Sequence, residues 1–173
     1  ECGCLYETRH TDCKSLGRIN YTIWSDVFVC PQCHSEMVFW DVAVDQAKGE
    51  VRDDWTCVHC TARLSKNPSK AGNTQQVERA FETRYDQTLN QHIRQARQAV
   101  VLINYSVGKK RYEKRPDAHD LTLIRQIEES DIPYWFPSNP MMSKGIQWGD
   151  TWRAGYHAGI SHVHHFFTRC NLW

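Results

Sequence analysis

The sequence predicts a mixed α+β protein. A four-cysteine zinc ribbon, which is a small antiparallel β module, would be followed by a β-hairpin or meander with one or two helices. Three observations predict this class: two Cys-x2-Cys pairs are separated by 23 residues, apolar residues alternate with polar ones around and after the pairs, and a capped helical pattern begins at residue 117.

Length and composition exclude several classes of protein. The chain has 173 residues, enough for one ordinary domain or two small ones. It carries 21 Lys and Arg against 20 Asp and Glu, which excludes a histone-like polycation and an acidic disordered tail. Hydrophobic residues make up 40% and include seven Trp, so a packed core is expected.

The ends of the chain and its longest apolar run bear on localisation. That run covers only residues 99–103, too few to span a bilayer, and residues 1–7 have no basic and apolar regions of a signal peptide. We therefore expect a soluble, cytoplasmic protein without membrane contact. The first residue is not Met and the chain ends on Leu172 and Trp173, so we expect a piece of a longer protein.

The cysteines are the most specific signal. Seven of the eight lie in the first 60 residues, and four form the pairs Cys30–Cys33 and Cys57–Cys60. A two-residue spacer lets both thiolates of a pair face one point, and two pairs complete a tetrahedron around Zn²⁺ with Zn–S near ~2.3 Å. Two disulfides or a redox motif fit less well, because no secretion signal and no βαβ pattern surround them. The sequence predicts one structural zinc ion.

The residues between the two pairs are expected to form a hairpin. Apolar residues alternate over residues 38–44, Lys48-Gly49 indicates a turn, and residues 50–56 alternate again. Each cysteine pair would then lie at the end of a hairpin. Four thiolates leave no open coordination position, so the zinc would stabilise the fold rather than catalyse. We expect His34 and His59 to be exposed turn residues.

Two other groups of metal-ligating side chains occur, and their role stays open. Near the N-terminus a second site would use Cys2, Cys4, His10 and Cys13, with free thiols as the alternative. Near the C-terminus the candidates are His157, His162, His164 and His165, and a strand would place His162 and His164 on one side. No acidic or cysteine partner follows at a familiar spacing, which favours a packing role.

Beyond the ribbon, strand patterns dominate. Residues 77–85 and 100–105 are expected strands, Gly108-Lys109 a turn and residues 111–114 a return strand, whereas residues 89–98 fit a strand or a helix. Asp117 is the expected N-cap of a helix, with Asp120 three residues later. The expected domains are an N-terminal segment with the ribbon, a linker, a basic hairpin and helix module, and a truncated C-terminal part, at residues 1–64, 65–76, 77–158 and 159–173.

A local excess of positive charge indicates a polyanionic partner. Between residues 77 and 115 nine Lys and Arg face four acidic residues. Such cations can follow a phosphate backbone, and Tyr105 and Tyr112 lie nearby for stacking. The alternative is a solvated charged face. The candidate DNA contacts are Arg94, Arg97, Lys109, Lys110, Arg111, Lys114 and Arg115.

No catalytic residue is expected in this chain. Asp131-Ile132-Pro133-Tyr134 differs by one residue from the Asp-Pro-Pro-Tyr motif with which amino-methyltransferases hold a flipped base. The second position lacks Pro, and a helix rather than an apolar strand precedes it. No glycine-rich turn for a nucleoside cofactor occurs.

Seven segments of the chain together resemble a known family, and they lie at residues 6–12, 17–27, 39–41, 102–105, 110–117, 132–137 and 159–169. They resemble the internal region of large prokaryotic adenine-specific DNA methyltransferases that contain a zinc ribbon and accompany restriction or phage-defence genes. Cys4, Cys13 and the loop at residues 143–158 depart from the pattern, whereas Cys30, Cys33, Cys57 and Cys60 match the ribbon.

The resemblance implies a target-recognition insertion between the S-adenosylmethionine site and the catalytic motif, both outside this chain. The parent enzyme would methylate adenine N6 with S-adenosylmethionine, while this piece would bind DNA, be inactive alone and contact the rest of the methyltransferase chain. A second hypothesis is a protein-interaction module that docks the enzyme on a restriction or defence partner. A third, a metal enzyme using His162, His164 and His165, lacks a carboxylate partner.

Overall fold

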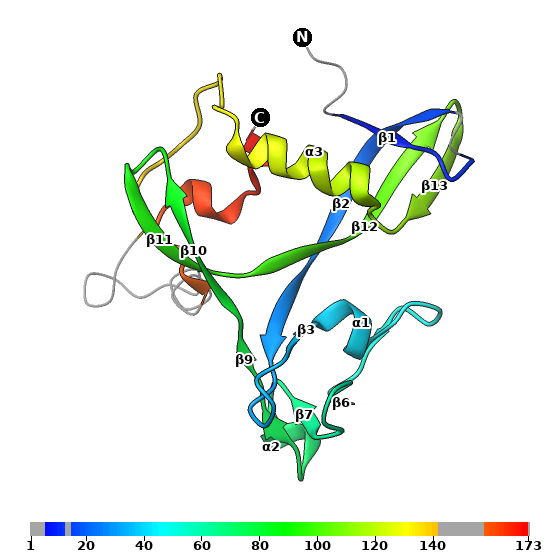
Figure 1. Ribbon diagram of the computed structural model, residues 1–173, viewed down its shortest axis with the longest axis vertical. Helices are drawn as coiled ribbons and strands as arrows, with labels where there is room; N and C mark the ends of the chain where they lie inside the picture. Colours follow the sequence, from blue (N-terminus) through cyan, green and yellow to red (C-terminus); the bar gives the residue numbers. More distant parts are fainter. Residues whose placement is uncertain (1–5, 13–14, 142–157, 173) are drawn as a thin grey trace. The chain divides into compact units, whose positions relative to one another are not determined.

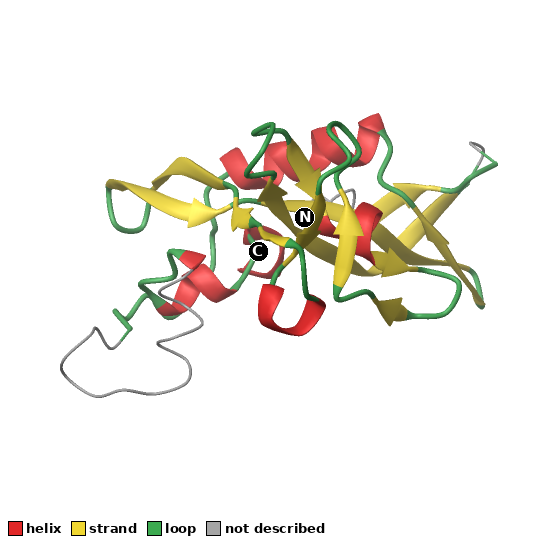
Figure 2. Ribbon diagram, turned by 90° about the horizontal axis from the view of Figure 1, so that it is seen from below, coloured by secondary structure: helices red, strands yellow, loops and turns green. Residues whose placement is uncertain are grey.

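The structure is a computed structural model that describes residues 6–12, 15–141 and 158–172. It confirms a mixed α+β protein made mostly of strands with few helices (Figure 2). The chain forms two compact units: Glu1–Trp24 with Val100–Trp173, here the sheet unit, and Ser25–Ala99, here the cysteine unit. These divisions fall at other positions than the expected linker at residues 65–76, which lies within the cysteine unit.

Antiparallel strands form the sheet of the sheet unit, in the order β1-β2-β12-β13 (Figure 1). They are β1 (Glu7–Arg9), β2 (Leu16–Val29), β12 (Gln98–Val107) and β13 (Lys110–Lys114). Thr8 is paired with Gly17 and Tyr105 with Tyr112. Gly108, with φ +60°, begins the two-residue turn between β12 and β13, the position where a type II′ hairpin needs glycine.

Helix α3 (Ala118–Glu129) covers one face of this sheet (Figure 1). It begins as expected with a capping box. The Asp117 side chain accepts hydrogen bonds from the backbone N–H groups of His119 and Asp120, and the Asp120 side chain accepts one from the Asp117 N–H. Thr8 Oγ1 on β1 donates to buried Asp120 at 2.5 Å. Side chains alternate along strands, so Thr8, Ile103 and Tyr105 share the helix-covered face.

The end of the chain contains η2 (Val163–Phe166) and α5 (Arg169–Leu172). The expected strand with His162 and His164 on one side is wrong, because the His165 N–H donates to the His162 carbonyl in a 3-10 turn. Three residues are too short for alternation to distinguish a strand from a turn.

The cysteine unit is built around the end of β2. Residues of β2 up to Val29 pair with β3 (Glu36–Val38) and β9 (Glu78–Arg79). A second sheet consists of β6 (Asp54–Thr56), β7 (Arg63–Ser65) and β8 (Gln75–Gln76). Strands β10 (Phe81–Asp86) and β11 (Gln91–Ala96) form a hairpin. Of the ambiguous residues 89–98, the first two thus lie in the hairpin turn and residues 91–96 form a strand.

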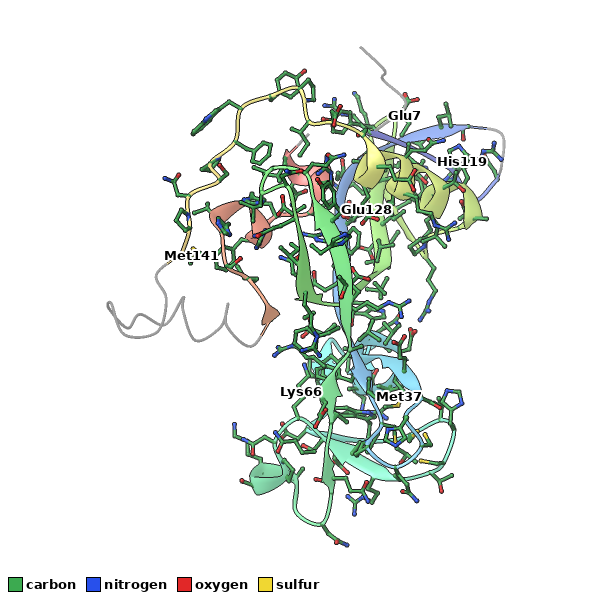
Figure 3. All side chains as sticks on the ribbon, turned by 60° about the vertical axis from the view of Figure 1, so that its left-hand side comes forward. Glu7, Met37, Lys66, His119, Glu128 and Met141 are labelled. Atoms are coloured by element: carbon green, nitrogen blue, oxygen red, sulfur yellow. The ribbon has the colours of Figure 1, made fainter. Side chains whose placement is uncertain are left out.

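The core of the cysteine unit contains aromatic, aliphatic and sulfur-bearing side chains. Phe39 meets Phe28 and Trp55 edge to face, with ring centroids 5.7 and 5.3 Å away. The Lys66 ammonium lies 3.3 Å from the Phe39 ring centroid, which is a cation–π contact. Figure 3 labels Lys66 together with Met37, another residue of the cysteine unit. The buried members are Phe28, Cys30, Met37, Ala43, Trp55, Cys57, Leu64 and Val77.

Two expectations within this unit are wrong. Residues 38–44 do not form one strand, because β3 ends at Val38 and α1 (Phe39–Ala43) follows. A helical turn puts Phe39 and Val42, three residues apart, on the same side against the core, whereas a strand would point them to opposite faces. Only the short pair β4 (Val44–Asp45) and β5 (Glu50–Val51) remains of the expected hairpin.

Residues 65–76 are not a structureless linker either. They contain the end of β7, helix α2 (Pro68–Ala71) and β8, which pairs in parallel with β7. Asn67 caps α2 by accepting from the Ser69 N–H, and Pro68 occupies the first helical turn. The Asn-Pro-Ser sequence within the expected linker is thus a helix start. Among the described residues, no helix is both long and apolar enough to cross a membrane.

Candidate metal centre

Each Cys-x2-Cys pair forms the turn of its own hairpin. Cys30 follows β2 and precedes β3, while Cys57 follows β6 and precedes β7. In the first turn the His34 N–H donates to the Cys30 carbonyl at 2.9 Å; in the second the Thr61 N–H donates to the Cys57 carbonyl at 3.0 Å. The two turns therefore share one backbone design.

The residue after each second cysteine has a left-handed backbone. His34 has φ 58° and Thr61 has φ 63°, a conformation that glycine adopts most easily. For Thr, with its branched Cβ, this is an uncommon conformation. Both positions come directly after a thiol, where the chain must reverse to bring two sulfurs together. The turn geometry therefore overrides the local preference of both residues.

The four sulfur atoms converge on one point. Cys30 Sγ lies 3.6 Å from Cys60 Sγ, and Cys33 Sγ lies 3.7 Å from Cys57 Sγ. All four ligand atoms are within 4.8 Å of one another. A disulfide would bring two sulfurs to about 2.05 Å, so these thiols are free. A tetrahedral ion with metal–sulfur bonds of ~2.3 Å spaces its ligands about 3.8 Å apart, which matches.

Local hydrogen bonds and burial act on the ionisation of the thiols. The side chain and backbone of Ser35 hydrogen-bond the Cys33 sulfur and lower its pKa to about 6. The Ala62 backbone acts in the same direction on Cys60, but burial and the neighbouring sulfurs outweigh it and raise that pKa to about 12. Four thiolates at one point repel each other, and a divalent cation removes that repulsion. The arrangement is thus suited to holding a metal ion.

The centre has the character of a closed, structural site. Cys30 and Cys57 are buried, and Cys33 and Cys60 are half-buried. Four protein ligands fill a tetrahedron, which leaves no position for water or substrate. His34 and His59 are exposed, as expected, and neither belongs to the group of converging ligands among the described residues.

The other metal-site candidates have different outcomes. Cys2, Cys4, Cys13 and His157 lie outside the described residues. His10 is hydrogen-bonded through Nδ1 to the Tyr105 hydroxyl at 2.7 Å, and its ring lies 4.5 Å from that of Tyr112. The imidazoles of His164 and His165 are buried with centroids 4.3 Å apart, and that of His162 lies 5.4 Å from that of His165.

The seven cations expected to contact DNA differ in their exposure and in the groups that they contact. Arg94 and Arg97 belong to the cysteine unit, where Arg94 covers the Phe81 ring at 4.2 Å and Arg97 pairs with Glu36. Lys114 is buried against Asp117 and Asp120. The exposed cations Lys109, Lys110 and Arg111 lie together at the β12–β13 turn, and Arg115 follows β13. The structure thus groups three of the seven on one turn.

Sequence reasoning missed the neighbours of this turn on other strands. Arg9 on β1 and Arg18 on β2 are exposed members of the same sheet. They lie about ninety residues before the turn, and no local pattern connects segments so far apart.

Comparisons with protein-family models, with curated proteins and with solved structures found no match.

Proposed function

We propose that the cysteine unit is a zinc ribbon whose Cys30, Cys33, Cys57 and Cys60 hold one structural Zn²⁺. The observation that carries this is the convergence of four free sulfurs from two turns of the same backbone design. Thiolate ligands in tetrahedral geometry favour Zn²⁺ or an iron–sulfur cluster. Binding would contribute directly to folding, because the unfolded chain has no preformed site.

We further propose that the chain is the DNA-binding, target-recognition insertion of an adenine-specific DNA methyltransferase in the cytoplasm. Its support is the sequence resemblance together with the exposed cations at the β12–β13 turn. An enzyme that flips a base needs contacts that hold the surrounding duplex, and a rigid module with cations supplies them. S-adenosylmethionine would bind elsewhere in the parent chain, and this chain alone would not transfer a methyl group.

Metal analysis and a salt series on duplex DNA test these proposals. We expect one zinc per chain by mass spectrometry and an affinity that falls steeply between 50 and 200 mM salt, by roughly 10³-fold if six phosphates are contacted. The triple variant Lys109→Glu, Lys110→Glu and Arg111→Glu should abolish most of the binding. Methyl transfer by the chain alone, or binding that ignores this charge reversal, would contradict the DNA-binding proposal.

A protein-interaction module is the second candidate, and one observation favours it. The segment after α3 exposes Trp135 by 88% and Tyr134 by 62%, and aromatic side chains of this kind are enriched at protein interfaces. Such a module would dock the methyltransferase on a restriction or defence partner. An aromatic interface should respond weakly to salt, so the same salt series separates the two candidates.

A further inference from the structure

The sheet of the sheet unit has one face that α3 does not cover. Thr8, Tyr105 and Tyr112 belong to the covered face, since Thr8 bonds Asp120 and the two tyrosine rings stack 5.7 Å apart. Neighbouring residues along each strand must point the other way. We name this side the open face, and its members include Arg9, Arg18, Asn20, Asn104, Ser106 and Arg111.

Hydrogen bonds between side chains hold the middle of the open face in place. The Asn20 amide on β2 donates to Asn104 Oδ1 at 2.8 Å and to Ser106 Oγ at 2.9 Å on β12. The Asn104 amide donates to the Glu113 carboxylate on β13 at 3.0 Å. These bonds connect three strands through their side chains as well as their backbones. They make the open face a fixed platform rather than a set of independent side chains.

Two arginines flank this platform. Arg18 lies two residues before Asn20 on β2, and Arg111 is paired with Ser106 from the other side of β12. Their strands are separated by β12, which places the two backbones roughly 10 Å apart at a strand spacing of about 4.8 Å. Arg9 on β1 and Lys109 in the β12–β13 turn extend the same band of cations. The acids on this side are Glu7, opposite Arg18, and Glu113, which Asn104 already bonds.

Four arginines of the cysteine unit are neutralised by carboxylates, whereas two arginines of the open face are not. In the cysteine unit Arg52, Arg63, Arg79 and Arg97 each form an ion pair with a carboxylate. Arg18 and Arg111 form none with any residue that the structure describes. Both are exposed. The positive charges of Arg18 and Arg111 are therefore available to a partner.

We propose that the open face binds the phosphate backbone of duplex DNA through Arg9, Arg18 and Arg111, continuing the contact proposed above for the β12–β13 turn. This rests on the DNA-binding function proposed above and identifies its surface. Charge complementarity selects a polyanion, and the planar fork of Arg suits phosphate oxygens. The β12–β13 ribbon has the form that the major groove of B-DNA admits, which favours duplex over single-stranded DNA. Arg94 and Arg97 belong to the cysteine unit and Lys114 to the covered face, so none of the three is a member of the open face.

The test is a salt series of fluorescence anisotropy with a labelled 20-base-pair duplex and the whole chain. Arg18→Gln and Arg111→Gln should each lower the slope of log affinity against log salt by about 0.9, and the double variant by about 1.8. Arg52→Gln and Arg94→Gln are matched controls that remove one positive charge from the cysteine unit, and they should leave the slope unchanged. Circular dichroism and zinc content confirm that each variant is folded.

The outcomes separate this inference from the function on which it depends. If the unchanged chain does not bind the duplex at low salt, both proposals fail. If it binds, and the triple charge reversal at the turn weakens it while Arg18→Gln has no effect, the DNA-binding function stands and the open-face surface is refuted. A loss of slope in Arg94→Gln equal to that in Arg18→Gln would also refute it, because the charge effect would then not depend on the open face.

Discussion

Lys114 and Asp120 form an ion pair beneath α3, with Nζ 2.8 Å from the Asp120 carboxylate. The side chain of Lys114 is 7% exposed and that of Asp120 is 2% exposed. Thr8 also donates to Asp120, so the pair connects β1, β13 and the start of α3. Lys114 is among the cations that the sequence suggested for DNA binding. Its surroundings assign it to the interior of the sheet unit.

Replacing Lys114 tests this role. Lys114→Met keeps the length of the side chain but leaves Asp120 without its cation, and breaking a buried pair from one side costs about 3–5 kcal/mol. We expect the urea midpoint of the sheet unit to fall accordingly. Lys110→Met, on the same strand but exposed, should change the free energy of unfolding by less than about 0.5 kcal/mol. Equal midpoints for the two variants would contradict the assignment.

Acid stability should depend on Asp117. Burial alone would raise its pKa, but hydrogen bonds from Lys114 and from the backbone of Asp120 and His119 lower it to about 2. The unfolded chain therefore takes up this proton first as the pH falls. The stabilisation is complete above about pH 4 and is lost as the pH approaches 2.

The measurement is urea unfolding of the unchanged chain and Asp117→Asn between pH 2 and 6. The variant should be less stable at pH 6, and the difference between the two chains should shrink as the pH falls toward 2. A difference that stays constant over this range would show that Asp117 does not act through its charge.

Removal of the proposed zinc ion should unfold the cysteine unit. Structural zinc contributes about 10–16 kcal/mol in small zinc modules, as much as the whole stability of an ordinary domain. We expect Cys57→Ser, at a residue only 1% exposed, to lose zinc and to lose hydrogen-exchange protection at Phe28 and Leu64. His59→Ala, in the same turn but exposed, should retain both. Full protection in the presence of a strong chelator would disprove a structural metal.

Gly17 has no room for a side chain. A Cβ at this position would lie 2.3 Å from Cδ2 of Tyr105, a ring that is fully buried. Gly17→Ala must displace the Tyr105 ring and should destabilise the sheet unit by about 1–3 kcal/mol. Gly17→Ala combined with Tyr105→Leu should recover part of this loss in a thermal melt, because the smaller side chain frees the space. No recovery would locate the strain elsewhere.

Local sequence was sufficient for features whose partners lie a few residues apart. The two Cys-x2-Cys turns, the Gly108 hairpin and the Asp117–Asp120 capping box each involve contacts across five residues or fewer. Their backbone geometry follows from spacing and residue type alone. The convergence of the two turns was also predictable, because two pairs of thiols with this spacing have few other uses.

Tertiary structure alone decided the features that depend on distant partners. Alternation at residues 38–44 resembles a strand, yet the core around Trp55 selects a helical turn that packs Phe39 and Val42 against it from the same side. The sequence alone also does not show which cations are neutralised. Arg97 pairs with Glu36, which lies 61 residues away in the sequence, and Lys114 is buried against the helix that follows it. Composition counts charges, but burial and long-range pairing determine which charges a partner can reach, and both exist only once the chain has folded.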